Sequence, residues 1–301
     1  MINSAADQIT TLPVPLPSWF RQEIPDMNKI SRMKNMFRES NLHTVCESAR
    51  CPNMGQCWSK GVATFMILGD VCSRACRFCA VSAGKPLTVD ADEPKHLAMT
   101  IQKMNLRYVV ITSVARDDLA DEGAGHFART ISEVRRLNPS LKIEILIPDF
   151  SSNKEHLKTV TDVQPEVISH NIETIRRLSK KIRPQADYNR SLQVLKIIKQ
   201  LNSSVFVKSS FMVGLGETHE EIFELMEDLL EAGCQILTVG QYLAPTQMKR
   251  HVKVERFVPL EEFENYKHIG MKLGFKHMMS GPLVRSSYIA EEGYRECLES
   301  I

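Results

Sequence analysis

Residues 46–79 read CESARCPNMGQCWSKGVATFMILGDVCSRACRFC, and this stretch decides how the rest of the chain is interpreted. It contains six of the eight cysteines of the chain, in two groups of three separated by an apolar run with the composition of a β-strand. The first triplet consists of Cys46, Cys51 and Cys57, and the second triplet consists of Cys72, Cys76 and Cys79. This clustering predicts two metal centres.

The spacing of the cysteines separates two kinds of metal centre. Tetrahedral zinc sites are usually built from two short pairs of ligands, but only Cys76 and Cys79 have the Cys-x2-Cys spacing. A zinc site with four cysteine ligands would need Cys234 or Cys297 as well, and would leave thiols over. Three close thiolates fit a 4Fe-4S cluster better, because they leave one of its four irons open.

The second triplet, with Phe78 before its last cysteine, resembles the signature of the radical S-adenosylmethionine (SAM) superfamily. In that superfamily the amino and carboxylate groups of SAM chelate the open iron. The first triplet, Cys46-x4-Cys51-x5-Cys57, lies just upstream and resembles the lipoyl synthase family. The stretches HNIET, MVGLGET, GQYLAPT and GPLVRSSY are also similar to that family, in the same order, so the resemblance covers residues 19–290. The departure at Ser210 and Phe211, where a glycine and an aliphatic residue are common, touches no expected ligand.

Composition and charge set limits on the function. With 301 residues, 43% hydrophobic, the chain can bury the core of one barrel-sized domain. A net charge of +2 without a basic block predicts neither nucleic acid nor a membrane surface as a partner. No apolar run approaches the ~18 residues of a membrane span, and the N-terminus lacks signal-peptide features. Clustered cysteines indicate a reducing compartment, so we expect a cytoplasmic location.

Short β-rich runs alternate with amphipathic helical segments along the chain. The predicted strands are Val62–Leu68, Tyr108–Thr112, Ile143–Ile147, Glu166–His170, Val205–Val213 and Ile236–Val239. The predicted helices are Met27–Leu42, Pro94–Met104, Ala124–Leu137, Asn153–Val160, Tyr188–Leu201 and Glu220–Ala232. Four prolines make the first 30 or so residues an extended arm, and Pro52 and Gly55 place the first triplet in a loop.

Six β-α units in succession predict an α/β fold with a parallel sheet, either doubly wound or a partial barrel. The resemblance implies the second: a partial (open) six-unit β/α TIM-like barrel with N-terminal and C-terminal extensions. We therefore expect residues 1–60 to carry the first triplet, residues 61–280 to form the barrel, and residues 281–301 to close on the first triplet. In such folds the chemistry lies in loops after the carboxyl ends of the strands.

Polar sequences follow several predicted strands and are candidates for SAM contacts. Asp117 could accept hydrogen bonds from ribose hydroxyls, or it could favour the dipole of a following helix together with Asp118. Asn171 and Glu173 belong to the HNIET stretch, and they are either SAM contacts or loop residues.

Gly214, Gly216 and Glu217 lie where a strand turns into a helix. Glycines there let the backbone approach a nucleotide, and Thr218 with Glu221 forms a capping box for the following helix. A similar glycine-rich strand end lies near the SAM adenine in the superfamily, so these three residues are the remaining candidates for cofactor binding.

Ser286 and Ser287 have an ordinary interpretation as the start of a final helix, with a serine as its N-cap. The resemblance implies another role for the GPLVRSSY stretch. In the lipoyl synthase family, the serine before the tyrosine is the fourth ligand of an auxiliary cluster. That serine corresponds to Ser287, with Ser286 as the alternative.

The resemblance implies insertion of two sulfur atoms, at carbons 6 and 8 of an octanoyl group, to form the lipoyl cofactor. It implies two 4Fe-4S clusters, SAM, and a reductant such as ferredoxin or flavodoxin. The implied substrate is octanoyl-lysine on a carrier domain, in a 2-oxoacid dehydrogenase acyltransferase subunit or the glycine cleavage H protein. Two alternatives stay open: another radical SAM sulfur-inserting or methylthiolating enzyme, and a zinc-stabilised binding protein.

Overall fold

The computed structural model describes residues 16–299, and one large sheet forms its centre. The strands of this sheet are β1 (His43–Thr44), β2 (Thr64–Ile67), β5 (Tyr108–Ser113), β6 (Lys142–Leu146), β7 (Val167–Ser169), β8 (Phe206–Val213), β9 (Ile236–Gln241) and β10 (His277–Gly281). They pair in this order, and every neighbouring pair is parallel except β1 with β2. A separate two-stranded sheet joins β3 (Val71–Cys72) and β4 (Ser82–Ala83). The alternation of strands and helices predicted from the sequence is confirmed.

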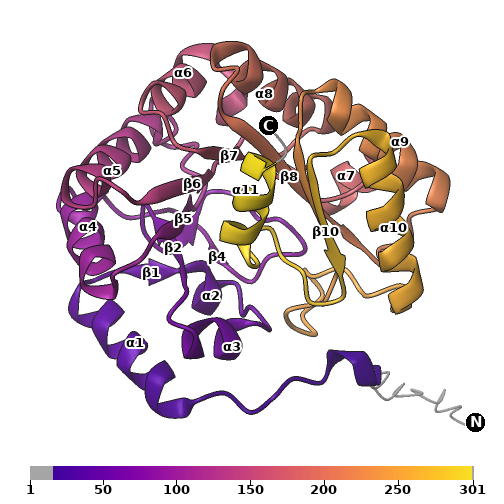
Figure 1. Cartoon of the computed structure of the whole chain (residues 1–301), viewed down its shortest axis with the longest axis horizontal. Helices are drawn as coiled ribbons and strands as arrows, with labels where there is room; N and C mark the ends of the chain where they lie inside the picture. The colour runs from indigo at the N-terminus through magenta and orange to yellow at the C-terminus, as the bar shows by residue number, and fades with distance from the viewer. Residues whose placement is uncertain (1–15, 300–301) are drawn as a thin grey trace, which may run out of the picture.

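Helices connect the parallel strands and lie outside the sheet (Figure 1). These helices are α4 (Glu93–Met104), α5 (Ala124–Leu137), α6 (Lys154–Asp162), α7 (Arg176–Ile182), α8 (Tyr188–Leu201), α9 (His219–Glu231) and α10 (Leu260–Leu273). Local sequence explains their ends. Thr218 and Glu221 form the predicted capping box of α9, and Gly274 ends α10 with a φ of +117°.

The sheet is an open barrel. Its order begins at β1 and ends at β10, and within residues 16–299 no strand pairing joins these two edges. Residues 282–289 run from β10 across this gap. The Asn53 side chain donates a hydrogen bond to the carbonyl of Leu283 at 2.6 Å, and the Thr64 hydroxyl donates to the Ser287 hydroxyl at 2.8 Å. The C-terminal segment therefore bridges the seam with side-chain hydrogen bonds, where a closed barrel would have a strand ladder.

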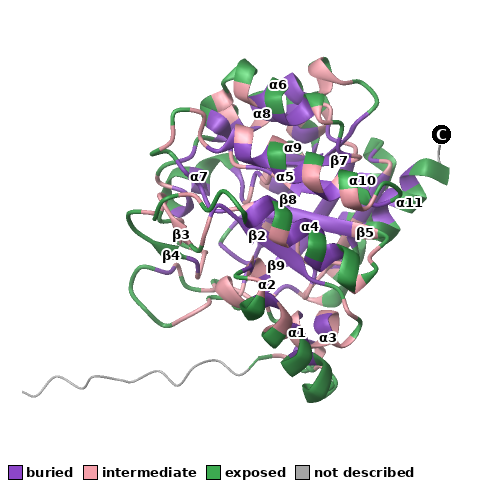
Figure 2. Cartoon of the chain, turned by 90° about the vertical axis from the view of Figure 1, so that its left-hand side faces the viewer, coloured by how far each residue is buried: buried purple, intermediate pink, exposed green. Residues whose placement is uncertain are grey.

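The last helix, α11 (Ala290–Glu299), covers the amino-terminal end of the barrel. Its Tyr294 and Cys297 pack in one cluster with Val167, Phe206 and Ile236, which are the first residues of β7, β8 and β9. Figure 2 shows α11 at one end of the molecule and β3, β4 and α7 at the other. Helix α11 therefore lies at the end opposite to the one where the parallel strands finish.

A buried ion pair crosses the barrel interior just above this helix. Lys208 of β8 and Glu144 of β6 are 2.7 Å apart and almost wholly excluded from water, and the Tyr108 hydroxyl donates a second hydrogen bond to Glu144. Removing one partner from such a pair would leave an uncompensated buried charge. Lys208 is therefore a structural element of the barrel floor.

Three expectations about secondary structure were wrong. The first triplet is not in a loop, because two short helices, α2 (Val45–Ser48) and α3 (Met54–Ser59), carry most of it. The final helix begins at Ala290, so neither serine before it is an N-cap. The sequence also missed β10, a short run whose burial comes from its pairing with β9.

The N-terminal segment is described from residue 16 onward, so residues 1–15 of the predicted arm lie outside the described part. Residues Ser18–Phe20 form a short 3-10 helix, η1, and the Phe20 ring packs edge-on against Phe257 at 5.7 Å. The chain then reaches α1 (Met27–Glu39), which begins at an N-cap, Asp26, and packs against α3. This segment therefore spans from the first triplet to the loop that follows β9.

Candidate metal and cofactor site

The second triplet begins at Cys72, the last residue of β3, and continues in a loop held by the backbone of two other segments. The Ser73 N–H donates to the carbonyl of Ala115 after β5, at 3.0 Å. The Arg77 N–H donates to the carbonyl of Ile182 at the end of α7, at 2.8 Å. All three thiols, those of Cys72, Cys76 and Cys79, are free and partly accessible. The fold therefore presents them together at the carboxyl end of the sheet.

The environment of these sulfurs fits metal-bound thiolates. The Cys72 sulfur accepts backbone N–H groups from Arg74 at 3.4 Å and from Ala115 at 3.3 Å. Burial raises the pKa of Cys76 to about 11 and of Cys79 to about 12. Thiols in such surroundings stay protonated unless a cation replaces the proton, as iron does.

Arg74, inside the second triplet, anchors its loop. The guanidinium lies 2.6 Å from Asp117 and 2.8 Å from the fully buried Asp149, and the Ser73 hydroxyl also donates to Asp117. Burial alone would raise the pKa of Asp117, but the hydrogen bonds from Arg74 and Ser73 outweigh it and lower the pKa. One interpretation of Asp117 placed it just before a helix, but α5 begins seven residues later. The observed partner of Asp117 is Arg74. Asp118 pairs with Arg116.

Asn171 and Glu173 follow β7 and lie beside the second triplet. The Asn171 side chain donates to Glu173 Oε1 at 3.1 Å. Glu173 has a φ of +66° and bridges to Phe211 of β8, a strained conformation that its neighbours impose. Desolvation raises the pKa of Glu173, and the carboxylate in turn raises the pKa of Cys76. A carboxylate is therefore held next to the thiols.

The glycine-rich turn after β8 is built around Glu217. Its carboxylate accepts the N–H groups of Gly214 at 2.5 Å and Leu215 at 2.8 Å. Gly214 has a φ of +93°, and a Cβ there would lie 2.1 Å from Gln241 Nε2. Gly216 also has a positive φ, +98°. The turn therefore requires glycine at Gly214 for space as well as for conformation.

A long loop after β9, residues 242–259, joins these parts, and the sequence analysis missed its role. His251 is buried and its Nε2 lies 3.1 Å from the carbonyl of Cys79, while its Nδ1 lies 2.7 Å from the Thr246 hydroxyl. The Val252 N–H donates to the carbonyl of Arg77, and the Glu255 N–H donates to that of Gly214. The loop therefore covers both the second triplet and the glycine-rich turn. The GQYLAPT stretch at its start was the available signal.

The first triplet lies at the seam of the barrel. The Cys51 N–H donates to the carbonyl of Cys46 at 3.0 Å, which folds α2 back towards α3. Burial, with a smaller contribution from the neighbouring Cys51, raises the pKa of Cys46 to about 11. Burial and Cys51 also raise the pKa of Cys57. These three thiols therefore interact with one another and, like the second set, need a cation to ionise.

The C-terminal segment meets this triplet. Ser287 reaches β2 through its hydrogen bond with Thr64, and the backbone of Thr64 is a hydrogen-bond partner of Cys46. The Arg285 guanidinium lies near Cys51 and donates to the carbonyl of Val284 at 2.7 Å. Gly240 of β9 makes this approach possible, because a Cβ there would lie 2.1 Å from the Val284 carbonyl oxygen. Sequence reasoning identified Ser287 but not Thr64 or Arg285.

The two remaining cysteines lie apart from both triplets. Cys234 donates to the carbonyl of Ile236 inside the core, and Cys297 belongs to α11. Within residues 16–299, no three His, Cys, Asp or Glu side chains converge closely enough to hold a single metal ion. A cubane cluster makes no such demand, since each of its thiolates binds a different iron.

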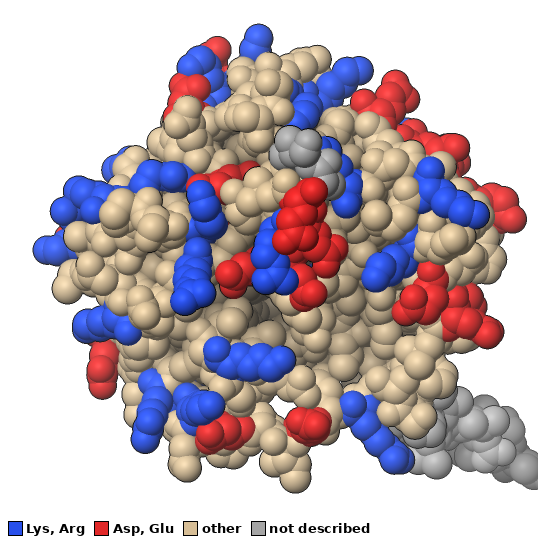
Figure 3. Space-filling model, in the orientation of Figure 1, with Lys and Arg blue, Asp and Glu red and all other residues tan. Residues whose placement is uncertain are grey.

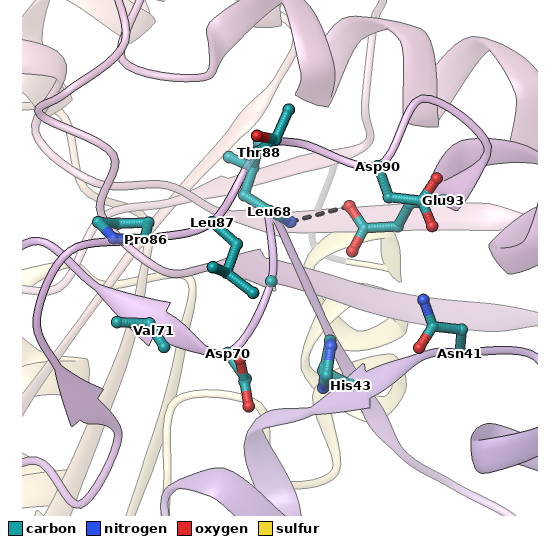
Figure 4. A pocket seen from close by; sticks show the side chains of 11 residues that line it. Asn41, His43, Leu68, Asp70, Val71, Pro86, Leu87, Thr88, Asp90 and Glu93 are labelled. Atoms are coloured by element: carbon teal, nitrogen blue, oxygen red, sulfur yellow. Dashed lines mark hydrogen bonds between the residues drawn. The ribbon is translucent and has the colours of Figure 1, made fainter.

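A cavity of about 290 Å³ opens between β1 and the segment that follows β2 (Figure 4). Its lining includes His43, three residues before Cys46, and Val71, the neighbour of Cys72. Glu93 lines its inner wall and accepts the N–H of Leu68 at 2.8 Å. The cavity thus adjoins the start of each triplet.

Comparisons with known proteins agree with this geometry. The profile of the radical SAM superfamily matches residues 66–229. The crystal structure of HydG, a maturase of the FeFe-hydrogenase, superposes with a TM-score of 0.58 at 13% identity, over 93% of this chain and 61% of that one. The structure of Streptococcus suis SuiB bound to S-adenosylmethionine gives 0.55 at 11% identity, over 84% and 60%. The fold and the second triplet therefore define a protein of the radical SAM superfamily.

The region of the first triplet distinguishes one family within this superfamily. A profile described as the N-terminal domain of lipoyl synthase matches residues 8–51. The lipoyl synthase of Caldanaerobacter subterraneus subsp. tengcongensis is 49% identical over 92% of this chain and 96% of its own length, and that of Rubrobacter xylanophilus is 51% identical over 92% and 85%. The chain belongs to the lipoyl synthase family, and it is a radical SAM sulfur-inserting enzyme. No helix within residues 16–299 is long and apolar enough to cross a membrane.

Proposed function

We propose that the chain inserts two sulfur atoms, at carbons 6 and 8 of a protein-bound octanoyl-lysine, and so forms the lipoyl group. The observation that supports this proposal is the hydrogen bond between Ser287 and Thr64, whose backbone is a partner of Cys46, because it brings a hydroxyl oxygen from the C-terminal segment to the strand beside the first triplet. Such a donor set leaves one cluster bond weaker than the rest, which suits a cluster that is consumed as a sulfur source.

The cysteines have separate roles in this proposal. Cys72, Cys76 and Cys79 would hold the 4Fe-4S cluster that binds SAM, while Cys46, Cys51, Cys57 and Ser287 would hold the auxiliary one. When bound, the cluster on the second triplet and SAM supply the radical that removes hydrogen from a saturated carbon. The auxiliary cluster on the first triplet supplies sulfur. The protein itself supplies placement and exclusion of water.

The SAM contacts follow from the positions around the second triplet. Glu173 and Asn171 would bind the amino group of SAM, since a carboxylate and an amide oxygen lie beside the thiols. Gly214, Gly216 and Glu217 would line the adenine side, where the absence of side chains lets the backbone approach the ligand. Asp117 would border the ribose while it holds Arg74.

The domain roles and partners complete the proposal. Residues 1–60 would carry the auxiliary cluster, residues 61–280 form the barrel, and residues 281–301 close the seam. The substrates would be octanoylated lipoyl carrier domains, in a 2-oxoacid dehydrogenase acyltransferase subunit or the glycine cleavage H protein. Ferredoxin or flavodoxin would deliver electrons, in the cytoplasm. Remote contacts with the carrier would help to hold the acyl chain, so free octanoate should react poorly.

The proposal is tested by anaerobic reconstitution followed by reaction with an octanoylated carrier domain. We expect roughly eight irons and eight sulfides per chain and a gain of two sulfur atoms in the carrier by mass spectrometry. Cys234→Ala is the matched control, because this cysteine is outside both triplets, and it should retain both clusters. A colourless protein with stoichiometric zinc, or a carrier that gains methylthio groups instead, would refute the proposal.

A further inference from the structure

Three segments meet at the outer edge of the second triplet and form one surface. Arg77, between Cys76 and Cys79, donates its N–H to the carbonyl of Ile182 at the end of α7 and accepts the N–H of Val252. His251 binds the carbonyl of Cys79 at 3.1 Å. The triplet loop, the end of α7 and the loop after β9 are therefore joined by hydrogen bonds.

The three segments of this surface carry a group of basic side chains, which we call the basic rim. All of its members are exposed, and none forms an ion pair with any residue in the range 16–299. The members of the basic rim are Arg77, Lys180, Lys181, Lys249, Arg250 and Lys253. No Asp or Glu occurs between residues 232 and 254, or between residues 174 and 186. The positive charge is therefore not neutralised by neighbours in sequence.

The basic rim is a local feature, since the whole chain has a net charge of only +2. On the α11 face, at the opposite end of the molecule, acidic and basic side chains are interspersed (Figure 3). Within the rim, Met248 is an apolar side chain with 60% of its surface exposed. Methionine and arginine are enriched in the centres of protein interfaces, so Met248 with Arg77 and Arg250 adds residue types typical of a docking surface to the charge of the rim.

We propose that the basic rim docks a small electron-carrier protein with an acidic surface around its redox centre. This inference rests on the proposed function, in which each SAM cleaved requires one electron at the second triplet, with one-electron oxidation of the carrier. Electron transfer weakens steeply with distance, so the carrier must dock at this end of the barrel. Opposite charges speed and orient such an encounter. The buried His251 follows Arg250 in the chain and lies 3.1 Å from the carbonyl oxygen of Cys79, so this segment of the rim adjoins a proposed cluster ligand.

The test compares two double charge reversals. Lys249→Glu with Arg250→Glu alters the rim, while Lys196→Glu with Lys267→Glu changes the net charge equally at exposed, unpaired positions on α8 and α10. Formation of 5'-deoxyadenosine is measured with a reduced acidic flavodoxin at varied concentration, and separately with dithionite, which needs no docking. At low salt we expect the rim variant to raise the apparent KM for flavodoxin by about tenfold or more, with the difference shrinking at high salt. The control and all dithionite rates should match the unaltered protein.

Two outcomes would decide against the inference. An unchanged KM for flavodoxin in the rim variant would overturn it. A raised KM for the octanoylated carrier domain in the dithionite reaction would overturn it too, because the rim would then bind the substrate protein. If the reversal damages the triplet loop, Lys180→Gln with Lys181→Gln tests the rim on another segment, with the same expected rise. Absence of SAM cleavage by the unaltered protein with dithionite would instead refute the proposed function.

Discussion

The side-chain hydroxyls of Thr64 and Ser287 are joined by a hydrogen bond of 2.8 Å, although 223 positions separate them in the chain. Thr64 opens β2, the neighbour of the edge strand β1, and Ser287 lies in the segment after the other edge strand, β10, so this bond crosses the opening of the barrel. The Thr64 backbone also contacts Cys46. One strand residue therefore positions both the serine and a cysteine of the first triplet.

Thr64→Val should impair product formation more than folding. The variant keeps the shape of the side chain and loses the hydroxyl that orients Ser287, at a cost of about 1 kcal/mol in unfolding free energy. We expect normal SAM cleavage and a clear fall in lipoyl product, measured on an octanoylated carrier. Thr238→Val is the matched control, since the buried Thr238 hydroxyl has no hydrogen-bond partner among the described residues. Equal product from both variants would contradict the role of Thr64.

Ser287→Ala should assemble both clusters and cleave SAM, yet fail to insert sulfur. Oxygen is a harder donor than thiolate and holds iron less tightly, so the iron at Ser287 is the one expected to leave. Ser287→Cys should hold that iron more firmly and also slow turnover. The measurements are iron content before and after one turnover, and product mass. Ser286→Ala is the neighbouring control, and normal lipoyl formation by Ser287→Ala would exclude a role for this serine.

Substitutions in the two triplets should have different effects on SAM cleavage. Cys72→Ala removes a ligand from the proposed SAM-binding cluster, so 5'-deoxyadenosine formation should stop. Cys46→Ala should retain some SAM cleavage while lipoyl product disappears. Both are measured by chromatography of the small products beside mass spectrometry of the carrier. If the two variants affected SAM cleavage alike, the division of labour between the triplets would be incorrect.

The ion pairs of Arg74 with Asp117 and Asp149 should make the stability of the fold sensitive to acid. The pKa values of Asp117 and Asp149 are lowered: burial opposes this, but hydrogen bonds from Arg74 prevail. A lowered pKa stabilises the fold above the unfolded value of about 4, and this contribution is lost as pH falls through the folded value. We expect unfolding free energy to decline below about pH 4.

Arg74→Met should remove that pH dependence and leave the buried Asp149 without its closest charge, at a cost of about 3 kcal/mol at neutral pH. Urea unfolding of the metal-free protein at several pH values measures both effects. Arg116→Met is the control, because its partner Asp118 is more exposed than Asp149, and should cost less. An Arg74→Met protein with the unaltered acid profile would argue against this anchor.

Gly214→Ala should be strongly destabilising. The added Cβ would lie 2.1 Å from Gln241 Nε2 and 2.6 Å from the Arg256 carbonyl oxygen, and the φ of +93° disfavours any side chain. Conformational strain and overpacking together should cost about 3 kcal/mol. Gly274→Ala has a similar φ of +117° but open space around it, so only the strain of about 1 kcal/mol should remain. Thermal unfolding of both variants measures whether steric overlap at Gly214 adds to the cost of the positive φ.

Much of the fold follows from local patterns. The apolar runs of β5, β6 and β8 lie in the parallel sheet and are largely buried, and six of the seven parallel strands are recognisable from such runs in the sequence. β10 was not recognisable, because His277–Gly281 has little apolar content and gains its burial from β9. The two helices of the first triplet escaped notice because Pro52 separates them and each is only a turn or so long.

The sequence by itself determined the chemistry of this protein, because the spacing of thiols along a short stretch limits the metal centres that they can hold. It also suggested Ser287 as a candidate ligand, through resemblance rather than through physics. Only the tertiary structure decided that Thr64 holds Ser287, that Arg74 engages Asp117, and that the loop after β9 covers Cys79. These contacts join residues far apart in the chain. They depend on how the barrel opens and on which strand ends meet, and no local pattern of residues encodes that geometry.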